Sequence, residues 1–343
     1  MSVKKIDKQA LDRWVDTLIG KHTVYGVTAK GERFVYARLT EVAALRLDFD
    51  VTMIPPKKYF LPQEDPLLAF DRQGGCQSVI SEEPFILFGV HPYDVVAIAQ
   101  MDAVFAKDHA DIHYLTRREN ATIVACDVVR PSAHVFAACM GAATADAGFD
   151  VLLTLIGESC IVDARTAKGE ELLKELTGAR KADAASLARR EQVWEDARRF
   201  LRMHQLNCRP EELPALLADS YDHPIWAERA ARCHSCGSCN LVCPTCYCFD
   251  MLDDPAWDLA GGKRSRRWDG CMLADFALVA GGHNFRRHRE DRYRHRYYRK
   301  GKYLWDRMQQ IACVGCGRCI TACTTLISHP VEVYNALLED RPR

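Results

Sequence analysis

The chain has 343 residues, 46 Lys and Arg against 46 Asp and Glu, and 48% hydrophobic residues. This length suggests about two domains, and the apolar content excludes a chain that is disordered throughout. No apolar run approaches the ~18 residues of a membrane helix, and the N-terminus lacks the apolar core of a signal peptide. We therefore expect a soluble, cytoplasmic protein without a membrane span.

The first 220 residues predict an α/β domain, because short apolar strands alternate with segments of helical periodicity. Helices are expected at residues 1–20, 94–105, 170–176 and 184–204, the last being a charged helix that connects to a second domain. Strands are expected at 22–27, 33–37, 84–90, 121–126, 151–156 and 160–162, with Pro-punctuated turns at 55–66. From residue 221 the composition changes to Cys, Gly, Arg and His, so the second domain is expected at 221–343.

Cysteine is the unusual residue of this sequence, since eleven of the 16 cysteines lie within residues 233–323. In a reducing compartment, this density predicts metal binding rather than disulfides. Two runs share the spacing C-x2-C-x2-C-x3-C, which is typical of bacterial ferredoxins. The first run is Cys233, Cys236, Cys239 and Cys243; the second is Cys313, Cys316, Cys319 and Cys323.

In such runs, three cysteines bind one 4Fe-4S cluster and the fourth binds the cluster of the other run. The prediction is therefore two clusters with crossed ligands. The first cluster would take Cys233, Cys236, Cys239 and Cys323; the second would take Cys313, Cys316, Cys319 and Cys243. Two zinc sites are the alternative, because C-x2-C pairs also bind zinc, but two identical four-cysteine runs fit crossed clusters better.

The spacing of the two runs predicts a two-cluster ferredoxin-like (α+β) domain with a long insertion at residues 249–306. Gly237, Gly315 and Gly317 are expected to let the backbone approach each cluster closely. One departure is Thr324, which follows Cys323 where ferredoxins have proline. Because that proline supplies no ligand, we expect ligation to be retained.

Three more cysteines, Cys246, Cys248 and Cys271, lie in or near the insertion. They are either buried thiols or three ligands of a third 4Fe-4S cluster. The fourth ligand would then come from elsewhere in the chain. Cys126, at the end of a predicted strand, and His283, in the insertion, are the two candidates.

The insertion is also basic, with 13 Lys and Arg against 4 Asp and Glu in residues 263–302. Arginine and tyrosine in alternation occur in nucleic-acid-binding proteins. Cations beside anionic iron–sulfur clusters, or on a surface for an acidic partner protein, explain the same pattern. We favour these two explanations and expect no nucleic acid.

Motifs for substrate conversion are absent from the sequence. No G-x-G-x-x-G follows a predicted strand, and there is no Walker loop, G-x-S-x-G or H-E-x-x-H. His91, at the end of a predicted strand, is either a turn residue or a catalytic one, and we favour the turn. The chain alone is therefore expected neither to catalyse a reaction nor to bind NAD(P)H.

Several motifs resemble one iron–sulfur family, which includes the beta subunit of soluble sulfhydrogenases (NiFe hydrogenases) and the corresponding iron–sulfur subunit of anaerobic sulfite reductase. They are the first run with its Pro-Thr-Cys-x-Cys248 extension, Arg-Arg-Trp-x2-Cys271, Ala-Gly-Gly-His-Asn-Phe-Arg286, the second run, and residues 53–60, 84–91 and 146–150. The resemblance implies an electron-transfer subunit between an FAD- and NAD(P)-binding diaphorase subunit and a catalytic metalloenzyme subunit. That catalytic subunit would be a hydrogenase, a sulfite reductase or a heterodisulfide-reductase-like protein.

The chain departs from this family in its N-terminal domain. Family members tend to have Cys at the position of Tyr93 and a C-x-C near residues 135–137, whereas Cys126 is retained. The resemblance thus implies that one metal site was lost as a unit. Cys126, Cys246, Cys248 and Cys271 would remain as one complete ligand set. The alternative function is a reductase in which a third cluster with an open coordination position binds the substrate itself.

Overall fold

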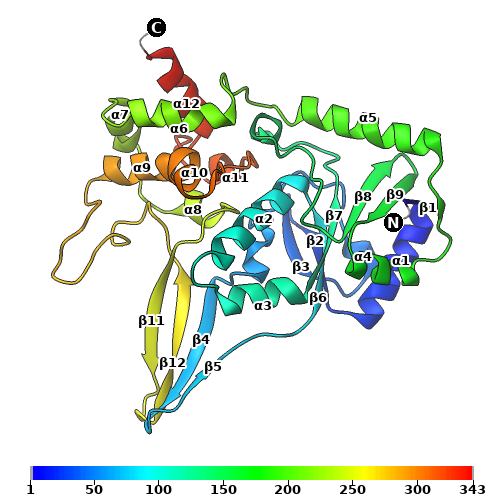
Figure 1. Ribbon diagram of the computed structural model, residues 1–343, viewed down its shortest axis with the longest axis horizontal. Coiled ribbons are helices and arrows are strands. Elements are labelled where there is room, and N and C mark those ends of the chain that lie inside the picture. The colour runs from blue at the N-terminus through cyan, green and yellow to red at the C-terminus, as the bar shows by residue number, and fades with distance from the viewer. Residues whose placement is uncertain (1–2, 342–343) are drawn as a thin grey trace.

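The computed structural model describes residues 3–341 and contains two sheets and a group of C-terminal helices (Figure 1). The larger sheet has eight strands in the order β10-β1-β9-β8-β7-β6-β2-β3. Its strands are β1 (Lys4–Asp7), β2 (Val24–Lys30), β3 (Arg33–Arg38), β6 (Phe85–Val90), β7 (Ala121–Cys126), β8 (Val151–Ile156), β9 (Ser159–Ala164) and β10 (Arg180–Lys181). The four central strands β2, β6, β7 and β8 are parallel, and the outer strands pair antiparallel.

Helices cover both faces of this sheet, as expected for a sheet with parallel centre strands. One face packs on α1 (Lys8–Lys21), and the other on α2 (Pro92–Ala106) and α3 (Ile112–Asn120). Successive residues of a strand point to opposite faces. Val124 and Cys126 of β7 therefore lie in the core under α1, whereas Ile123 and Ala125 lie in the core under α2. The predicted α/β architecture is confirmed for this part of the chain.

A second, four-stranded antiparallel sheet projects from the molecule (Figure 1). Its order is β11-β12-β4-β5, with β4 (Glu64–Asp71), β5 (Cys76–Ser78), β11 (Phe249–Pro255) and β12 (Gly261–Trp268). The hairpin β11–β12 belongs to the predicted insertion, and β4–β5 to the N-terminal half of the chain. The sheet therefore joins segments from both sides of residue 220, and that domain boundary stays a prediction.

The remaining elements lead to the cysteine runs and surround them. They are α4 (Ala167–Leu172), α5 (Ala184–Phe200), α6 (Leu213–Asp219), α7 (Ile225–Ala231), α8 (Ser238–Leu241), α9 (Arg289–Tyr298), α10 (Leu304–Met308), α11 (Arg318–Thr321) and α12 (Pro330–Glu339), with a π turn at Arg299–Tyr303 and short 3-10 turns at Val42–Ala44, Pro56–Tyr59, Ala137–Met140, Leu173–Glu175 and Pro210–Glu212. In Figure 1, α5 runs from the large sheet towards these helices. None of the helices within residues 3–341 is long and apolar enough to cross a membrane.

Some predicted elements differ from the structure. The predicted N-terminal helix begins only at Lys8, because the Asp7 side chain caps it by accepting from the Ala10 amide at 2.7 Å, and the preceding residues form β1. The helix predicted at 184–204 ends at Phe200. Within residues 221–341 the strands are β11 and β12, both in the insertion. The cysteine runs themselves lie among helices and loops, and the ferredoxin-like (α+β) arrangement of this part stays a prediction.

Candidate functional site

The four cysteines predicted for the first cluster line one cavity. Cys233, Cys236 and Cys239 come from the loop before α8 and its first turn, and Cys323 follows α11. We call this cavity the first cysteine cavity. The fourth cysteine comes from the other run because α8 and α11 lie against each other.

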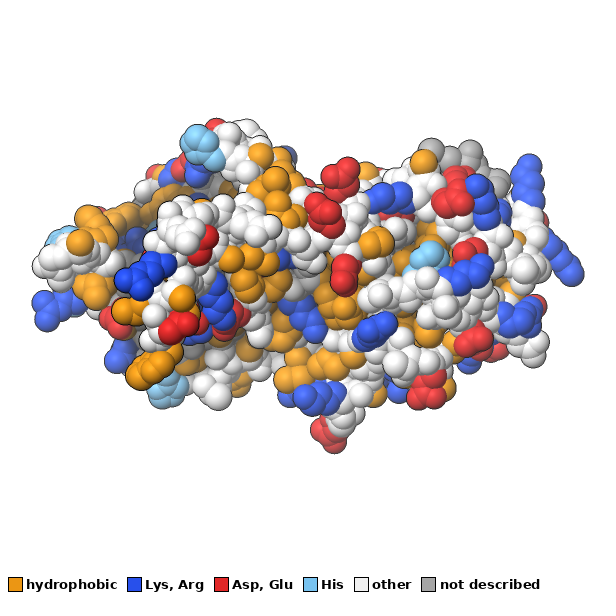
Figure 2. All heavy atoms as spheres, turned by 90° about the horizontal axis from the view of Figure 1, so that it is seen from below, with side chains coloured by type: hydrophobic (Ala, Val, Ile, Leu, Met, Phe, Trp, Pro, Cys, Tyr) orange, Lys and Arg blue, Asp and Glu red, His pale blue; other side chains and the backbone are white. Residues whose placement is uncertain are grey.

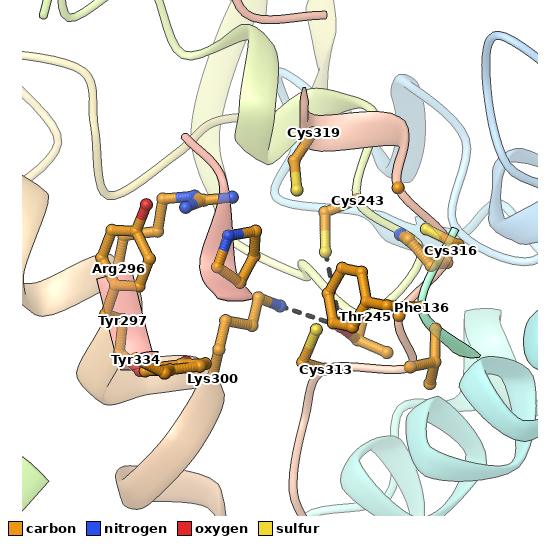
Figure 3. A pocket seen from close by; sticks show the side chains of 15 residues that line it. Phe136, Cys243, Thr245, Arg296, Tyr297, Lys300, Cys313, Cys316, Cys319 and Tyr334 are labelled. Atoms are coloured by element: carbon orange, nitrogen blue, oxygen red, sulfur yellow. Dashed lines mark hydrogen bonds between the residues drawn. The ribbon is translucent and has the colours of Figure 1, made fainter. Parts of the chain in front are cut away.

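The second cysteine cavity has the reciprocal composition. It is lined by Cys313, Cys316 and Cys319 together with Cys243, which follows α8 (Figure 3). Figure 3 shows the sulfur atoms facing a common space, with Thr245 and Lys300 at one side. The Lys300 ammonium donates to the Thr245 hydroxyl at 2.8 Å. The structure thus brings together both crossed sets that the spacing predicts.

A glycine with positive φ precedes the one-turn helix inside each run. Gly237 (φ 72°) caps α8 and Gly317 (φ 80°) caps α11, a conformation that favours glycine. In the first run, a main-chain amide is directed at a sulfur: the Ser235 N–H donates to the Cys233 sulfur at 3.4 Å. Burial raises the pKa of Cys323, but hydrogen bonds with Thr325 and Ser328 outweigh burial and lower this pKa to about 7. These hydrogen bonds stabilise the Cys323 thiolate, whereas burial raises the pKa of Cys239, Cys313, Cys316 and Cys319.

The arrangement fits 4Fe-4S clusters better than zinc. A zinc ion draws four sulfurs to within about 2.3 Å of one point, whereas a cluster occupies the space between them. Four cysteines line each of the two cavities. Among residues 3–341, no three His, Cys, Asp or Glu side chains converge on a single ion position. Four thiols around an enclosed space are the donor set that a cubane requires.

The N-terminal domain closes the second cysteine cavity. The Phe136 N–H donates to the Gly315 carbonyl at 2.8 Å, and the Phe136 side chain lines the cavity. Arg318, within the second run, donates to both oxygens of Asp94 at 2.6 Å and to the Thr52 carbonyl at 2.8 Å. All three of these polar residues are buried. This contact was not predicted, because Arg318 and Asp94 are 224 residues apart in the sequence.

The three extra cysteines also lie near one another. The Asn240 amide nitrogen is 3.5 Å from the Cys271 sulfur and 3.7 Å from the Cys246 sulfur. Burial, followed by the charge of Cys248, raises the pKa of Cys271 to about 11. The buried Lys57 ammonium donates to the Cys246 carbonyl at 2.7 Å and lies 4.1 Å from the centre of the Trp268 ring.

Neither candidate for a fourth ligand lies beside these three cysteines in the described part of the chain. Cys126 lies on the α1 face of the large sheet, where its thiol contacts the Asp127 carbonyl and where Cys160 is its cysteine neighbour. Tyr247 and Trp268, which flank the three-cysteine group, pack on the opposite face. Strand alternation therefore directs Cys126 away from the insertion. His283 is exposed in the loop before α9, with its ring against Phe285.

His91 is a structural residue in this fold. Its ring is fully buried and stacks on Phe49 with 3.8 Å between the ring centres. Its Nδ1 lies 2.6 Å from the Tyr93 hydroxyl. Burial, followed by the charge of Arg318, holds the pKa of His91 well below its usual value. Tyr93, at the position where the family tends to have cysteine, thus belongs to the packing beneath the second run.

Comparison with known proteins agrees with this geometry. Residues 232–327 match the model of the 4Fe-4S dicluster domain family. The chain is 33% identical over 317 residues to the sulfhydrogenase 2 subunit beta of Pyrococcus furiosus, and the match covers 92% of each chain. No solved structure matches. A chain with this domain and this similarity along nearly its whole length is an iron–sulfur, electron-transferring subunit of an oxidoreductase, and it belongs to the sulfhydrogenase beta-subunit family.

Proposed function

We propose that this chain relays electrons between an FAD- and NAD(P)-binding subunit and a catalytic metalloenzyme subunit. The supporting observation is the pair of adjacent four-cysteine cavities, which share Arg296 as a lining residue. A 4Fe-4S cluster in each would accept and release single electrons. The assignment of Cys233, Cys236, Cys239 and Cys323 to one cluster, and of Cys313, Cys316, Cys319 and Cys243 to the other, is part of the proposal.

The two cavities differ in their access to the surface, which suggests the order of the relay. Cys236 of the first cavity is exposed, whereas Cys316 of the second is buried beneath the N-terminal domain. Electron transfer between subunits requires a cofactor near the contact surface. We therefore place the exchange with one partner protein at the Cys236 side, and the second cluster further inside.

Single-cysteine variants test the crossed assignment. Cys236→Ser should perturb the EPR signal of the first cluster, and Cys243→Ser that of the second, although both residues belong to the first run. The wild-type chain, purified anaerobically, should contain at least eight irons, four per cluster. If both substitutions perturb the same signal, the crossed assignment is wrong.

A third 4Fe-4S cluster at Cys246, Cys248 and Cys271 is also part of the proposal. The buried Lys57 ammonium, which donates to the Cys246 carbonyl and whose charge acts on Cys246 and Cys248, is a suitable neighbour for an anionic cluster. Such a cluster would extend the relay towards the insertion. Because Cys126 lies on the other face of the sheet, the fourth ligand is no longer assigned to it.

Iron analysis tests the third cluster. The anaerobically purified chain should then contain about twelve irons, and changing all three cysteines to alanine should remove about four of them. Changing the buried Cys126 and Cys160 to alanine is the matched control and should leave the iron content unchanged. An unchanged content in the triple variant would identify these cysteines as buried thiols.

The separation of Cys126 from the three cysteines favours a second candidate function, a reductase that binds its substrate at the third cluster. A cluster with three cysteine ligands has one iron open to an exogenous ligand. Cyanide added to the reduced chain should then change one EPR signal and leave those of the two ferredoxin-type clusters unchanged. No change on addition of cyanide would leave the relay as the function.

The partner proteins are proposed from the family. The relative from Pyrococcus furiosus is a sulfhydrogenase subunit, so a hydrogenase catalytic subunit is the first choice, with sulfite reductase and heterodisulfide-reductase-like subunits as the others. We place the complex in the cytoplasm. Affinity purification of the tagged chain from its own cells, with partners identified by mass spectrometry, distinguishes the three.

A further inference from the structure

Arg296 occupies an unusual position between the two cysteine cavities. It projects from α9 and lines both the first and the second cavity. Only 4% of the residue is exposed. In Figure 3 its guanidinium lies at the edge of the second cavity, on the side of Cys319. A long charged side chain is seldom buried to this extent without a partner of opposite charge.

Arg296 has no such partner within residues 3–341. Arg294 pairs with Asp291 and Arg318 pairs with Asp94, but neither carboxylate pairs with Arg296. The buried Nε of Arg296 also has no hydrogen-bond partner. Burying an unpaired cation costs several kcal/mol. The groups that act most strongly on its charge include Cys239 of the first run and Cys319 of the second. An anionic cluster in each of the two cysteine cavities would therefore supply the negative charge that balances the Arg296 guanidinium.

We propose that Arg296 is the shared counter-cation of both clusters and raises the reduction potential of each. A fixed positive charge stabilises the additional electron of a reduced cluster, so one guanidinium between two clusters acts on both. This inference rests on the proposed ligation of the two clusters. Arg296 is a positioning residue and supplies no ligand.

Two other cations provide a comparison within the same segment. Lys300, four residues further along, is buried and lines the second cavity, and it is absent from the lining of the first. Arg294 points the other way: its guanidinium lies 4.0 Å from the centre of the Tyr221 ring and bonds Asp291 at 2.9 Å. The geometry thus predicts three different effects on the two clusters.

The test is a redox titration of the full chain followed by EPR, with iron content measured in every variant. Arg296→Met should lower the midpoint potentials of both clusters, and Arg296→Lys, which keeps the charge, should restore most of the shift. Lys300→Met should lower the potential of the second cluster only. Arg294→Gln is the matched control and should change neither potential.

The outcomes separate this inference from the assignment on which it rests. If the wild-type chain lacks two distinct cluster signals, the proposed ligation fails. If both signals are present and Arg296→Met shifts one potential or neither, the shared role of Arg296 is wrong. If Arg296→Met does not retain iron, Arg296→Gln is used instead, because it removes the charge but keeps a polar side chain. Unchanged midpoint potentials of the two clusters in Arg296→Gln would equally overturn the inference.

Discussion

At the scale of single residues, several basic side chains of the insertion are buried inside the protein. Arg292, Arg296 and Lys300 are buried around the cysteine runs. Arg266 is buried as well and pairs with Asp65, at 2.9 Å, and with Asp111. These side chains offset negative charge inside the protein. Of the two explanations that the basic composition allowed, cations beside the cysteine runs describe these residues better than a docking surface.

The buried pair of Arg318 and Asp94 yields a prediction at this scale. Arg318→Met leaves the Asp94 carboxylate without its cation, and breaking a buried pair costs about 3–5 kcal/mol of unfolding free energy. Burial already raises the pKa of Asp94 despite the opposing effect of Arg318. In the Arg318→Met variant, the fold tolerates Asp94 better as the protonated acid than as the carboxylate. The loss of unfolding free energy should therefore grow as the pH rises above the pKa that Asp94 has in the unfolded chain.

Anaerobic thermal unfolding at several pH values measures this effect. The double variant Arg318→Met, Asp94→Asn removes the buried charge as well, and it should recover part of the lost stability and show a weaker pH dependence. Equal stability of Arg318→Met and the wild type would mean that the ion pair does not hold the second run against the N-terminal domain.

At the scale of elements, the short helix α11 is positioned by close contact with the loop before the 3-10 turn Ala137–Met140. A Cβ on Gly317 would lie 2.5 Å from the His134 carbonyl oxygen, and one on Gly315 would lie 2.6 Å from the Phe136 carbonyl oxygen. Both neighbours are main-chain atoms, which cannot move aside by a change of rotamer. Glycine in the second run therefore serves the contact between domains, in addition to the approach to a cluster that its spacing suggests.

A matched pair of glycine substitutions tests this contact. Gly317 (φ 80°) and Gly281 (φ 86°) share a left-handed conformation, but a Cβ on Gly281 meets nothing within 4 Å. Gly281→Ala should cost only about 1–2 kcal/mol of unfolding free energy from the backbone conformation. Gly317→Ala should cost more and reduce the iron bound by the second run. Equal iron content and equal stability of the two variants would rule out the close contact.

At the scale of the whole molecule, the N-terminal domain covers one cluster site and leaves the other near the surface. Phe136 and Asp94 belong to the cover of the second cavity, whereas Cys236 of the first is exposed. Hydrophobic side chains, among them Leu278, Val279 and Phe285 of the loop before α9, are exposed in this part of the chain. Figure 2 shows hydrophobic side chains beside Lys and Arg at the end of the molecule where this loop lies.

This asymmetry predicts the order in which the clusters are lost in air. Oxygen should destroy the first cluster before the second, because the second is closed off by the N-terminal domain. An EPR time course after exposure to air measures both rates. Phe136→Ala opens the second cavity and should bring its rate of loss closer to that of the first. Simultaneous loss in the wild-type chain would contradict the protective role of the domain.

The sequence by itself determined the parts of this protein that depend on local spacing. Eight cysteines in two runs, each containing a one-turn helix, carry their own geometry, so the two crossed sets could be predicted from the residues. The strands at 121–126 and 151–156 were also predicted with the bounds observed, because continuous apolar runs mark buried strands.

Only the tertiary structure decided the features that join distant segments. The pairing of β12 with β4, the ion pair of Arg318 with Asp94, and the place of Arg296 between two cavities depend on contacts across most of the chain. Cys126 is the clearest case. Cysteine is a common metal ligand, but successive side chains of β7 point to opposite faces of the sheet. The Cys126 thiol therefore lies on the face that packs on α1, opposite the insertion.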